Sequence, residues 1–397
     1  MINVLLLAFC QGLLLMNAVT LVSVGALAGY ALADNKALAT LPTTLYVLGA
    51  AVSTFAASMW MKRVGRRNGF LTGGLFALVG SVIAATAIAK SSLALLCAGT
   101  FLLGIYNAFG QYYRFAAADA ATPEFRAKAI SYVMAGGLIG GILGPELTKT
   151  TRALMEPTYM GSYASLFVYS LLAMAIVSFL RIPSPKSDAH AEGARPFAEI
   201  ARQPAFIVAV TVAALGYGTM NLLMTATPLA MGFCGHPYGA AATVITAHVV
   251  AMFAPSFFTG TLIQRFGVLN VIFAGIVAMA ACIAMALAGQ AIPNFMVALV
   301  LLGLGWNFMY IGGTTLLTET YAPAEKAKAQ GFNELVVFTV QGISAFSSGA
   351  LVNTRGWDVL SYTAAPLIVA AGVATAWLWT RRTSMSENGE RASARRG

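Results

Sequence analysis

Apolar stretches about as long as a membrane is thick follow one another along most of this chain. Residues 69–89, 205–231 and 268–290 are three of the twelve that we count. A helix of about 20 apolar residues spans the hydrocarbon core of a bilayer. Only 10% of the 397 residues are charged, whereas a soluble domain has about 25%. The sequence therefore predicts an all-α polytopic membrane protein with twelve transmembrane helices, and it excludes a soluble enzyme.

The basic residues are distributed unequally between the two sides of these spans. Loops on one side, together with the C-terminal tail, carry 19 of the 24 Lys and Arg residues. The five on the other side are Lys36, Lys90, Lys149, Arg152 and Arg355. Because basic loops stay in the cytoplasm, both termini are expected there. The formal net charge of +10 thus reports orientation in a lipid bilayer and does not indicate a nucleic-acid partner.

A polar stretch with several prolines separates the spans into two groups of six. We expect an N-terminal half at residues 1–181, a cytoplasmic linker at 182–204 and a C-terminal half at 205–380. Residues 381–397 are rich in Ser, Glu and Arg, and we expect them to form a disordered cytoplasmic tail.

The two halves look like copies of one another. Three matched pairs stand 200 or 202 positions apart: Asn107 and Asn307, Pro123 and Pro323, and Arg63–Gly65 and Arg265–Gly267. Parallel repeats of six helices are typical of secondary transporters that work by alternating access. The sequence therefore predicts two pseudo-symmetric six-helix halves that meet at a central cavity.

The loop after the second span resembles the loop motif of the major facilitator superfamily, whose pattern is Gly, three residues, then Asp-Arg-x-Gly-Arg-Arg. The chain departs from it at Ser58 and Lys62, which replace the Gly and the Asp, and the second copy has Gln264 at the acidic position. The resemblance implies a role in conformational switching for the residues that match: Arg63, Gly65, Arg66, Arg67, Arg265 and Gly267.

Two carboxylates near membrane depth are candidates for carrying a coupling proton. Intramembrane carboxylates are costly and usually functional. Glu146, however, is followed three residues later by Lys149, so a structural ion pair is an equal alternative. Glu334 stands in the first turn of a span, where a carboxylate also stabilises a helix N-terminus.

Spans seven and eight each carry two possible metal ligands four residues apart, and such residues lie on one face of a helix. These ligands are Met220 and Met224 in the first and His248 and Met252 in the second. Counting from the outer ends places Met224 level with His248, and Met220 level with Met252. Thioethers with an imidazole favour copper, above all Cu(I). Methionines are also ordinary core residues, so either pair alone would carry little weight.

The two pairs together resemble the hallmark of the CcoA-type copper importers, a CalT-like branch of the major facilitator superfamily. The resemblance implies import of copper across the bacterial cytoplasmic membrane for assembly of cbb3-type cytochrome oxidase. Copper would then be a transported substrate, with no permanently bound cofactor, and copper chaperones would be downstream partners.

Further candidates lie at the outer end of span seven, where Met231, Cys234 and His236 could collect copper, although the same segment also reads as a plain turn. The main alternative function is a proton-coupled exporter of drugs or small metabolites. It would use aromatic residues around an apolar cavity: Tyr106, Tyr112, Trp306 and Tyr310. No phosphate-binding loop or other enzyme motif is found.

Overall fold

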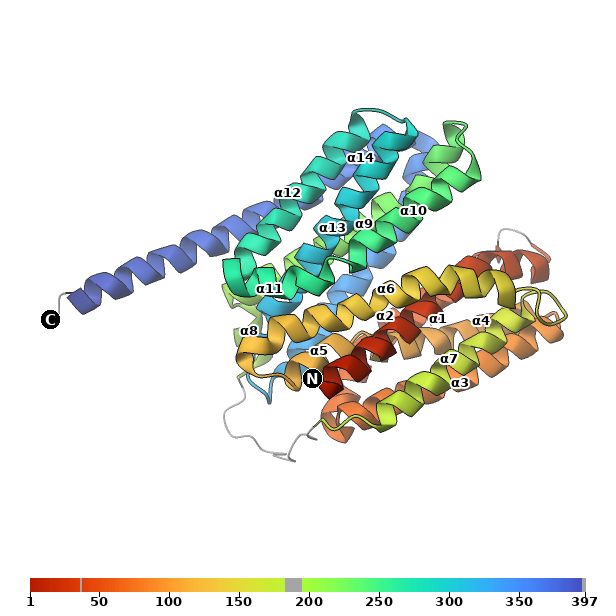
Figure 1. Ribbon diagram of the computed structural model, residues 1–397, viewed down its shortest axis with the longest axis horizontal. Helices are drawn as coiled ribbons and strands as arrows, with labels where there is room; N and C mark the ends of the chain where they lie inside the picture. The colour runs from red at the N-terminus through yellow and green to blue at the C-terminus, as the bar shows by residue number, and fades with distance from the viewer. Residues whose placement is uncertain (36–37, 183–194, 395–397) are drawn as a thin grey trace. The chain divides into compact units, whose positions relative to one another are not determined.

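The computed structural model describes residues 1–35, 38–182 and 195–394, and these residues form helices joined by turns, with no strand among them (Figure 1). The elements are α1 (Ile2–Leu32), α2 (Leu41–Val64), α3 (Arg66–Ala89), α4 (Leu93–Gly110), α5 (Tyr113–Asp119), the 3-10 turn η2 (Pro123–Phe125), α6 (Arg126–Thr151), α7 (Met160–Ser178), α8 (Phe197–Ala201), α9 (Pro204–Phe233), α10 (Tyr238–Phe253), α11 (Ser256–Phe266), α12 (Val268–Leu287), α13 (Ile292–Leu317) and α14 (Lys326–Ala394).

Ten helices of the described chain are long and apolar enough to cross a membrane, and the pair α10 and α11, bent by 42°, makes an eleventh span. The apolar part of α14 runs over 58 residues, Lys326–Thr383, or about 87 Å at 1.5 Å per residue. That length is far more than the roughly 30 Å of hydrocarbon core. Non-helical Gly356 (φ 81°, ψ 177°) interrupts it, and the predicted spans 331–354 and 358–380 lie on either side of this break. The helices thus account for twelve spans.

The two polar segments of the sequence differ in what the structure describes. Most of the expected linker, residues 183–194, lies outside the described residues. In the expected tail, α14 stays helical to Ala394, where the sequence predicts disorder from residue 381. The reason is that no proline follows the last span, and Arg, Glu and Ala are residues that continue a helix readily.

The contacts divide the chain into two compact units. The first unit contains Met1–Ala194, Phe253–Gly260 and Ala322–Gly342. The second contains Arg195–Met252, Thr261–Tyr321 and Ile343–Gly397. In the first unit α1 packs on α6, and α4 lies against both α2 and α3. In the second unit α13 packs against both α9 and α12.

The sequence repeat is also visible in the backbone. Gly65 precedes α3 with φ 85° and ψ 164°, and Gly267 precedes α12 with φ 87° and ψ 151°. Residues with a side chain rarely adopt this conformation. The two glycines therefore form the same tight turn between the second and third spans of each half.

Candidate functional site

His248 is the most informative of the predicted site residues. It lies on α10 and is fully buried, and its Nδ1 is 2.8 Å from the backbone carbonyl oxygen of Leu299 on α13. A carbonyl only accepts, so Nδ1 carries the hydrogen and Nε2 keeps its lone pair. Within the described part of the chain, Nε2 has no hydrogen-bond partner. A backbone carbonyl that accepts from one ring nitrogen and so fixes the tautomer is typical of histidines that bind metals through the other nitrogen.

Helix α13 holds the whole His248–Met252 turn closely. A Cβ atom added to Gly303 would lie 2.6 Å from the carbonyl oxygen of His248 and 2.9 Å from the backbone nitrogen of Met252. One turn further, Asn307 donates from Nδ2 to the carbonyl oxygen of Met252 at 2.6 Å. Leu299, Gly303 and Asn307 thus place α10 by contacts on three successive turns of α13.

The methionine pair of α9 faces the same helix. Gly216 lies against the side chain of Met309, and the ring of Tyr217 meets that of Tyr310 on α13, with centroids 5.2 Å apart. Met220 follows Gly216 by one turn and is buried, whereas Met224 follows by two turns and is half-buried. Residues four apart share a helix face, so both methionines are expected toward the side of α9 that packs on α13.

These contacts give a common scale for depth along α13. Gly313 lies beside Ala209 and Gly216 beside Met309, so α9 and α13 run in opposite directions. Because the helices are antiparallel, each turn forward on α9 corresponds to one turn back on α13. Met220, one turn after Gly216, therefore lies near the level of Gly305. Met224, two turns after Gly216, lies near the level of Leu301.

Helix α10 runs in the same direction as α13, because His248 lies between Leu299 and Gly303, and Met252 between Gly303 and Asn307. Met224 therefore shares a level with His248, and Met220 with Met252, as the count from the helix ends predicts. The observation is a shared level along α13 and not a direct contact between the two pairs. Metal binding by the four residues stays a prediction.

The described residues contain no group of three or more His, Cys, Asp or Glu side chains that could hold a metal ion. A site made of the four predicted residues would have thioethers as its main ligands. Such a ligand set is soft and uncharged, which suits Cu(I) and is poorly suited to Mg²⁺ or Ca²⁺.

The candidate ligands Met231, Cys234 and His236, at and after the C-terminal end of α9, are only partly brought together. Cys234 Sγ lies 3.0 Å from Gln290 Oε1, and His236 Nε2 lies 2.8 Å from the carbonyl oxygen of Gln290. Met231 is fully buried, unlike the exposed Gln290. Cys234 and His236 thus meet at one residue, and a role for the three in copper capture stays a prediction.

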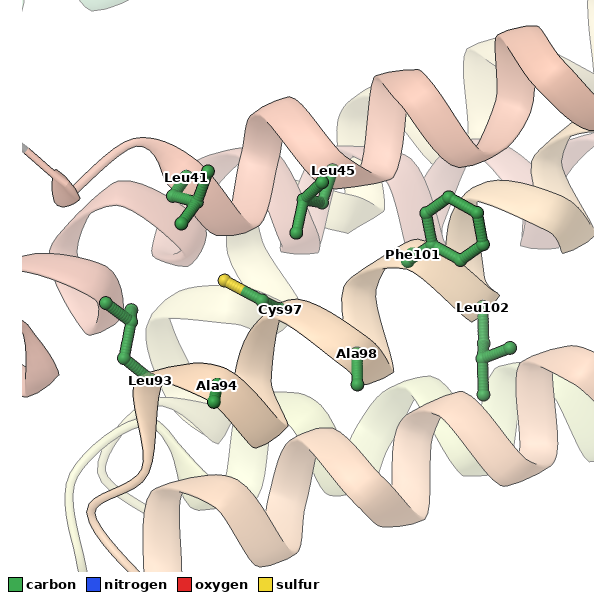
Figure 2. Close-up of a pocket in the computed structure, with 8 residues that line it drawn as sticks. All are labelled: Leu41, Leu45, Leu93, Ala94, Cys97, Ala98, Phe101 and Leu102. Carbon is green, nitrogen blue, oxygen red and sulfur yellow. The ribbon is translucent and has the colours of Figure 1, made fainter.

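The aromatic candidates fall into two separate groups. Trp306 and Tyr310 stack on each other in the second unit, with ring centroids 5.0 Å apart, and the Tyr217 ring lies edge-on to both. Tyr106 and Tyr112 belong to the first unit and are buried there. The first unit also has an apolar groove of 720 Å³ between α2 and α4, lined by Leu41, Leu45, Leu93, Ala94, Cys97, Ala98, Phe101 and Leu102 (Figure 2).

The two candidate proton carriers differ sharply in environment. Glu146 pairs with Lys149 at 2.6 Å, with the two side chains 65% and 70% exposed, so the structural alternative describes it well. Glu334 is fully buried, and its Oε1 is 2.5 Å from Nη2 of Arg114, a residue only 2% exposed. The sequence analysis did not predict this pair, because Arg114 lies 220 residues before Glu334, on α5, which follows the fourth span after Gly110.

One arginine of the loop motif differs from the others. Arg66 is buried and pairs through Nε with Asp119 Oδ2 at 3.0 Å, whereas Arg63, Arg67 and Arg265 are exposed. The acidic position of the motif is occupied by Lys62, and the carboxylate that Arg66 binds belongs to Asp119, the last residue of α5. Conformational switching by these residues stays a prediction.

Comparison with known proteins identifies relatives over nearly the full length. The sequence profile described as Major Facilitator Superfamily matches residues 4–255 and 217–397. The riboflavin transporter RfnT of Brucella anthropi is 40% identical over 369 residues, which cover 92% of this chain and 93% of the relative. The uncharacterised MFS-type transporter YddS of Bacillus subtilis is 30% identical and covers 91% of this chain and 87% of its own.

Solved transporters share the fold at low identity. The fucose:proton symporter FucP of E. coli aligns with a TM-score of 0.75 at 17% identity, covering 95% of this chain and 98% of its own. A bacterial homologue of the iron transporter ferroportin aligns with a TM-score of 0.73 at 12% identity, covering 95% and 99%. The predicted fold class is thereby confirmed.

Proposed function

We propose that this chain, which belongs to the major facilitator superfamily, imports copper into the bacterial cytoplasm across the inner membrane. Membership makes it a multi-pass membrane transporter and not an enzyme. In the proposal the four ligands on α9 and α10 hold Cu(I) during alternating access, with both termini in the cytoplasm. Copper chaperones and assembly of cbb3-type cytochrome oxidase are the destination that the resemblance to CcoA-type importers implies.

The observation that carries the proposal is the state of His248. Its Nδ1 hydrogen is engaged by Leu299, and its Nε2 lone pair lies fully buried without a hydrogen-bond partner among the described residues. Leaving a buried polar atom unsatisfied costs about 1–3 kcal/mol. A metal ion bound at Nε2 would remove this cost, and the thioethers of the same ligand set favour copper among the metals that imidazole binds.

The methionines support the same assignment. Met224 lies at the level of His248 along α13, and Met220 lies at the level of Met252, one turn away. Two successive levels of soft ligands would let an ion move between neighbouring positions without meeting a thiolate or a carboxylate. Weak, uncharged ligands of this kind suit a transported ion, which must be released as well as bound.

Riboflavin is the second candidate substrate. The relative RfnT is described as a riboflavin transporter and is 40% identical to this chain. The aromatic cluster of Tyr217, Trp306 and Tyr310 consists of the kind of side chain on which a flat heterocycle stacks, although Trp306 and Tyr310 are buried and stacked on each other. In this alternative His248 would act as a hydrogen-bonding residue.

The test is uptake into proteoliposomes that contain the purified full-length protein. Two substrates are offered in separate assays: radioactive copper, which ascorbate keeps as Cu(I), and riboflavin. Each is given to the wild type, His248→Leu and Met220→Leu. Met220→Leu removes the sulfur at nearly constant volume, so a loss of transport with normal protein abundance would report ligation and not misfolding.

We expect the wild type to accumulate copper and both variants to lose that uptake. Copper uptake at wild-type rates by both variants would overturn the proposed site. Riboflavin uptake without copper uptake by the wild type would establish the second candidate in place of the first.

A further inference from the structure

The apolar groove of the first unit lies between the N-terminal ends of α2 and α4 (Figure 2). Leu41 and Leu93, the first residues of these helices, line one end of it, and Phe101 and Leu102 line the other. Seven of its eight lining residues have pure hydrocarbon side chains, and the eighth is Cys97. A site for a polar substrate carries a few convergent polar groups, so this groove fits an apolar ligand.

The groove opens away from the interior of the first unit. Ala94 and Ala98, which line it, are exposed, whereas Leu96 and Leu103 are buried. At 3.6 residues per turn the two pairs fall on opposite faces of α4. An exposed apolar groove on a membrane-spanning helix favours contact with lipid chains, because water in it would touch hydrocarbon on nearly every side.

The groove is about as long as one leaflet of a bilayer is deep. Helix α4 advances about 14 Å between Leu93 and Leu102 at 1.5 Å per residue, and half of the hydrocarbon core is about 15 Å. Beyond this length the two helices close on each other. A Cβ atom added to Gly49 on α2 would overlap the carbonyl of Phe101, and one added to Gly104 on α4 would overlap the carbonyl of Tyr46. The groove therefore ends at mid-membrane and accepts a chain from one leaflet.

A lysine stands at the mouth of the groove. Lys90, at the C-terminal end of α3, precedes the lining residue Leu93 by three positions and is exposed. None of the ion pairs among the described residues involves it. Basic residues at the membrane surface attract anionic lipid headgroups. The phosphate of a lipid whose chain fills the groove would lie on the side of the membrane where Lys90 stands.

We propose that the groove between α2 and α4 binds one acyl chain of an anionic phospholipid, whose phosphate pairs with the ammonium group of Lys90. The cation favours a lipid over a second copy of this chain. In a symmetric pair of copies that met at this groove, the two Lys90 residues would lie at the same level of the membrane and repel each other. The proposal is independent of the transported substrate, and only the identity of the leaflet, the outer one, rests on the orientation proposed above.

The test is photochemical labelling of the full-length protein in lipid nanodiscs. The probe is a phosphatidylglycerol that carries a diazirine in one acyl chain, and mass spectrometry of peptides locates the crosslinks. Ala98→Trp fills the groove from its exposed side, and Ala94→Trp is a second variant of the same kind. Ala280→Trp is the matched control, because Ala280 is an exposed alanine on α12, outside the groove.

In the wild type, labelling of residues 41–45 and 93–102 should exceed that of the exposed face of α12 at least fivefold. Ala98→Trp and Ala94→Trp should lower it to the α12 level, whereas Ala280→Trp should leave it unchanged. Labelling spread evenly over α2, α4 and α12 would overturn the proposal, and so would groove labelling that neither groove variant lowers. An unlabelled groove in a protein that native mass spectrometry shows to be a dimer would assign the groove to a second copy instead.

The headgroup is tested with a phosphatidylcholine that carries the same diazirine. The wild-type groove should take up the phosphatidylglycerol probe about fivefold more than this zwitterionic one, as expected for one basic residue near an anionic surface. Lys90→Gln should label equally with both lipids. Lys149→Gln, which removes another exposed lysine, should keep the preference. Equal wild-type labelling by both lipids would overturn the role of Lys90, and because no uptake is measured, it would leave the proposed transport function untouched.

Discussion

The contact of α2 with α4 in the first unit and that of α10 with α13 in the second unit have the same construction. A glycine on one helix lies against the backbone of the other, Gly104 beside Tyr46 and Ala50 and Gly303 beside His248 and Met252. The atoms nearest to a Cβ at the glycine are of the same kind in both contacts. They are the carbonyl of Tyr46 or His248 and the backbone nitrogen, four residues later, of Ala50 or Met252. The repeat thus conserves close helix packing through a residue without a side chain.

The side chains at these equivalent positions do not repeat. Tyr46 and Ala50 stand in the first unit where the second unit has His248 and Met252. The glycine contact therefore serves the fold, which both halves need, whereas the imidazole and the thioether are additions to one half. We therefore expect the transport function to depend on His248 and Met252, which distinguish the second contact from the first.

The largest effect is expected when the side chain that distinguishes the second contact is removed. Replacing His248 with Leu should lower copper uptake by about 100-fold or more. Even the loss of a group that only hydrogen-bonds to a metal ligand lowers metal affinity or activity by about 10–100-fold. Tyr46→Phe, at the equivalent position, should stay within about twofold. Uptake by proteoliposomes at equal protein abundance is the measurement, and equal losses in both variants would contradict the assignment.

Alanine at the two glycines should destabilise both contacts alike. A Cβ atom at Gly303 would overlap the backbone of α10, and one at Gly104 would overlap that of α2. Overpacking of this kind costs about 1–3 kcal/mol. Thermal unfolding of each variant in detergent measures the cost, and a large loss at only one of the two positions would show that the packing is not equivalent.

A smaller effect is expected at the asparagines that correspond in the two halves, Asn107 and Asn307. Asn307 donates to the carbonyl oxygen of Met252, whereas Asn107 Oδ1 accepts from Gln111 Nε2 at 3.1 Å. Asn307→Leu should weaken Cu(I) binding about tenfold, at the low end of the range for groups that orient ligands. Asn107→Leu should leave Cu(I) affinity unchanged, which a competition titration against a colorimetric chelator would report.

The smallest effect is expected outside both contacts. Glu146→Gln removes an exposed ion pair, and such pairs contribute about 0–1 kcal/mol. The variant should unfold within a few degrees of the wild type and transport normally. A marked loss of either property would mean that Glu146 has a role beyond its pair with Lys149.

Much of the fold could be predicted from the sequence because membrane spans are set by length and apolarity alone. The same helical period allowed Met224 to be matched in depth with His248. Partners from other helices could not be predicted, since nothing local indicates them: Arg66 and Asp119 are 53 residues apart, and Arg114 and Glu334 are 220 apart. The glycine contact that seats His248, and the carbonyl that fixes its tautomer, likewise depend on tertiary packing.

X-ray absorption at the copper edge decides whether His248 and the methionines form a metal site. The purified wild type loaded with Cu(I) should give a first shell of one nitrogen from His248 together with two or three thioether sulfurs. His248→Leu should lose the nitrogen and keep the sulfurs. A wild-type spectrum without sulfur, or one that His248→Leu leaves unchanged, would contradict the copper site.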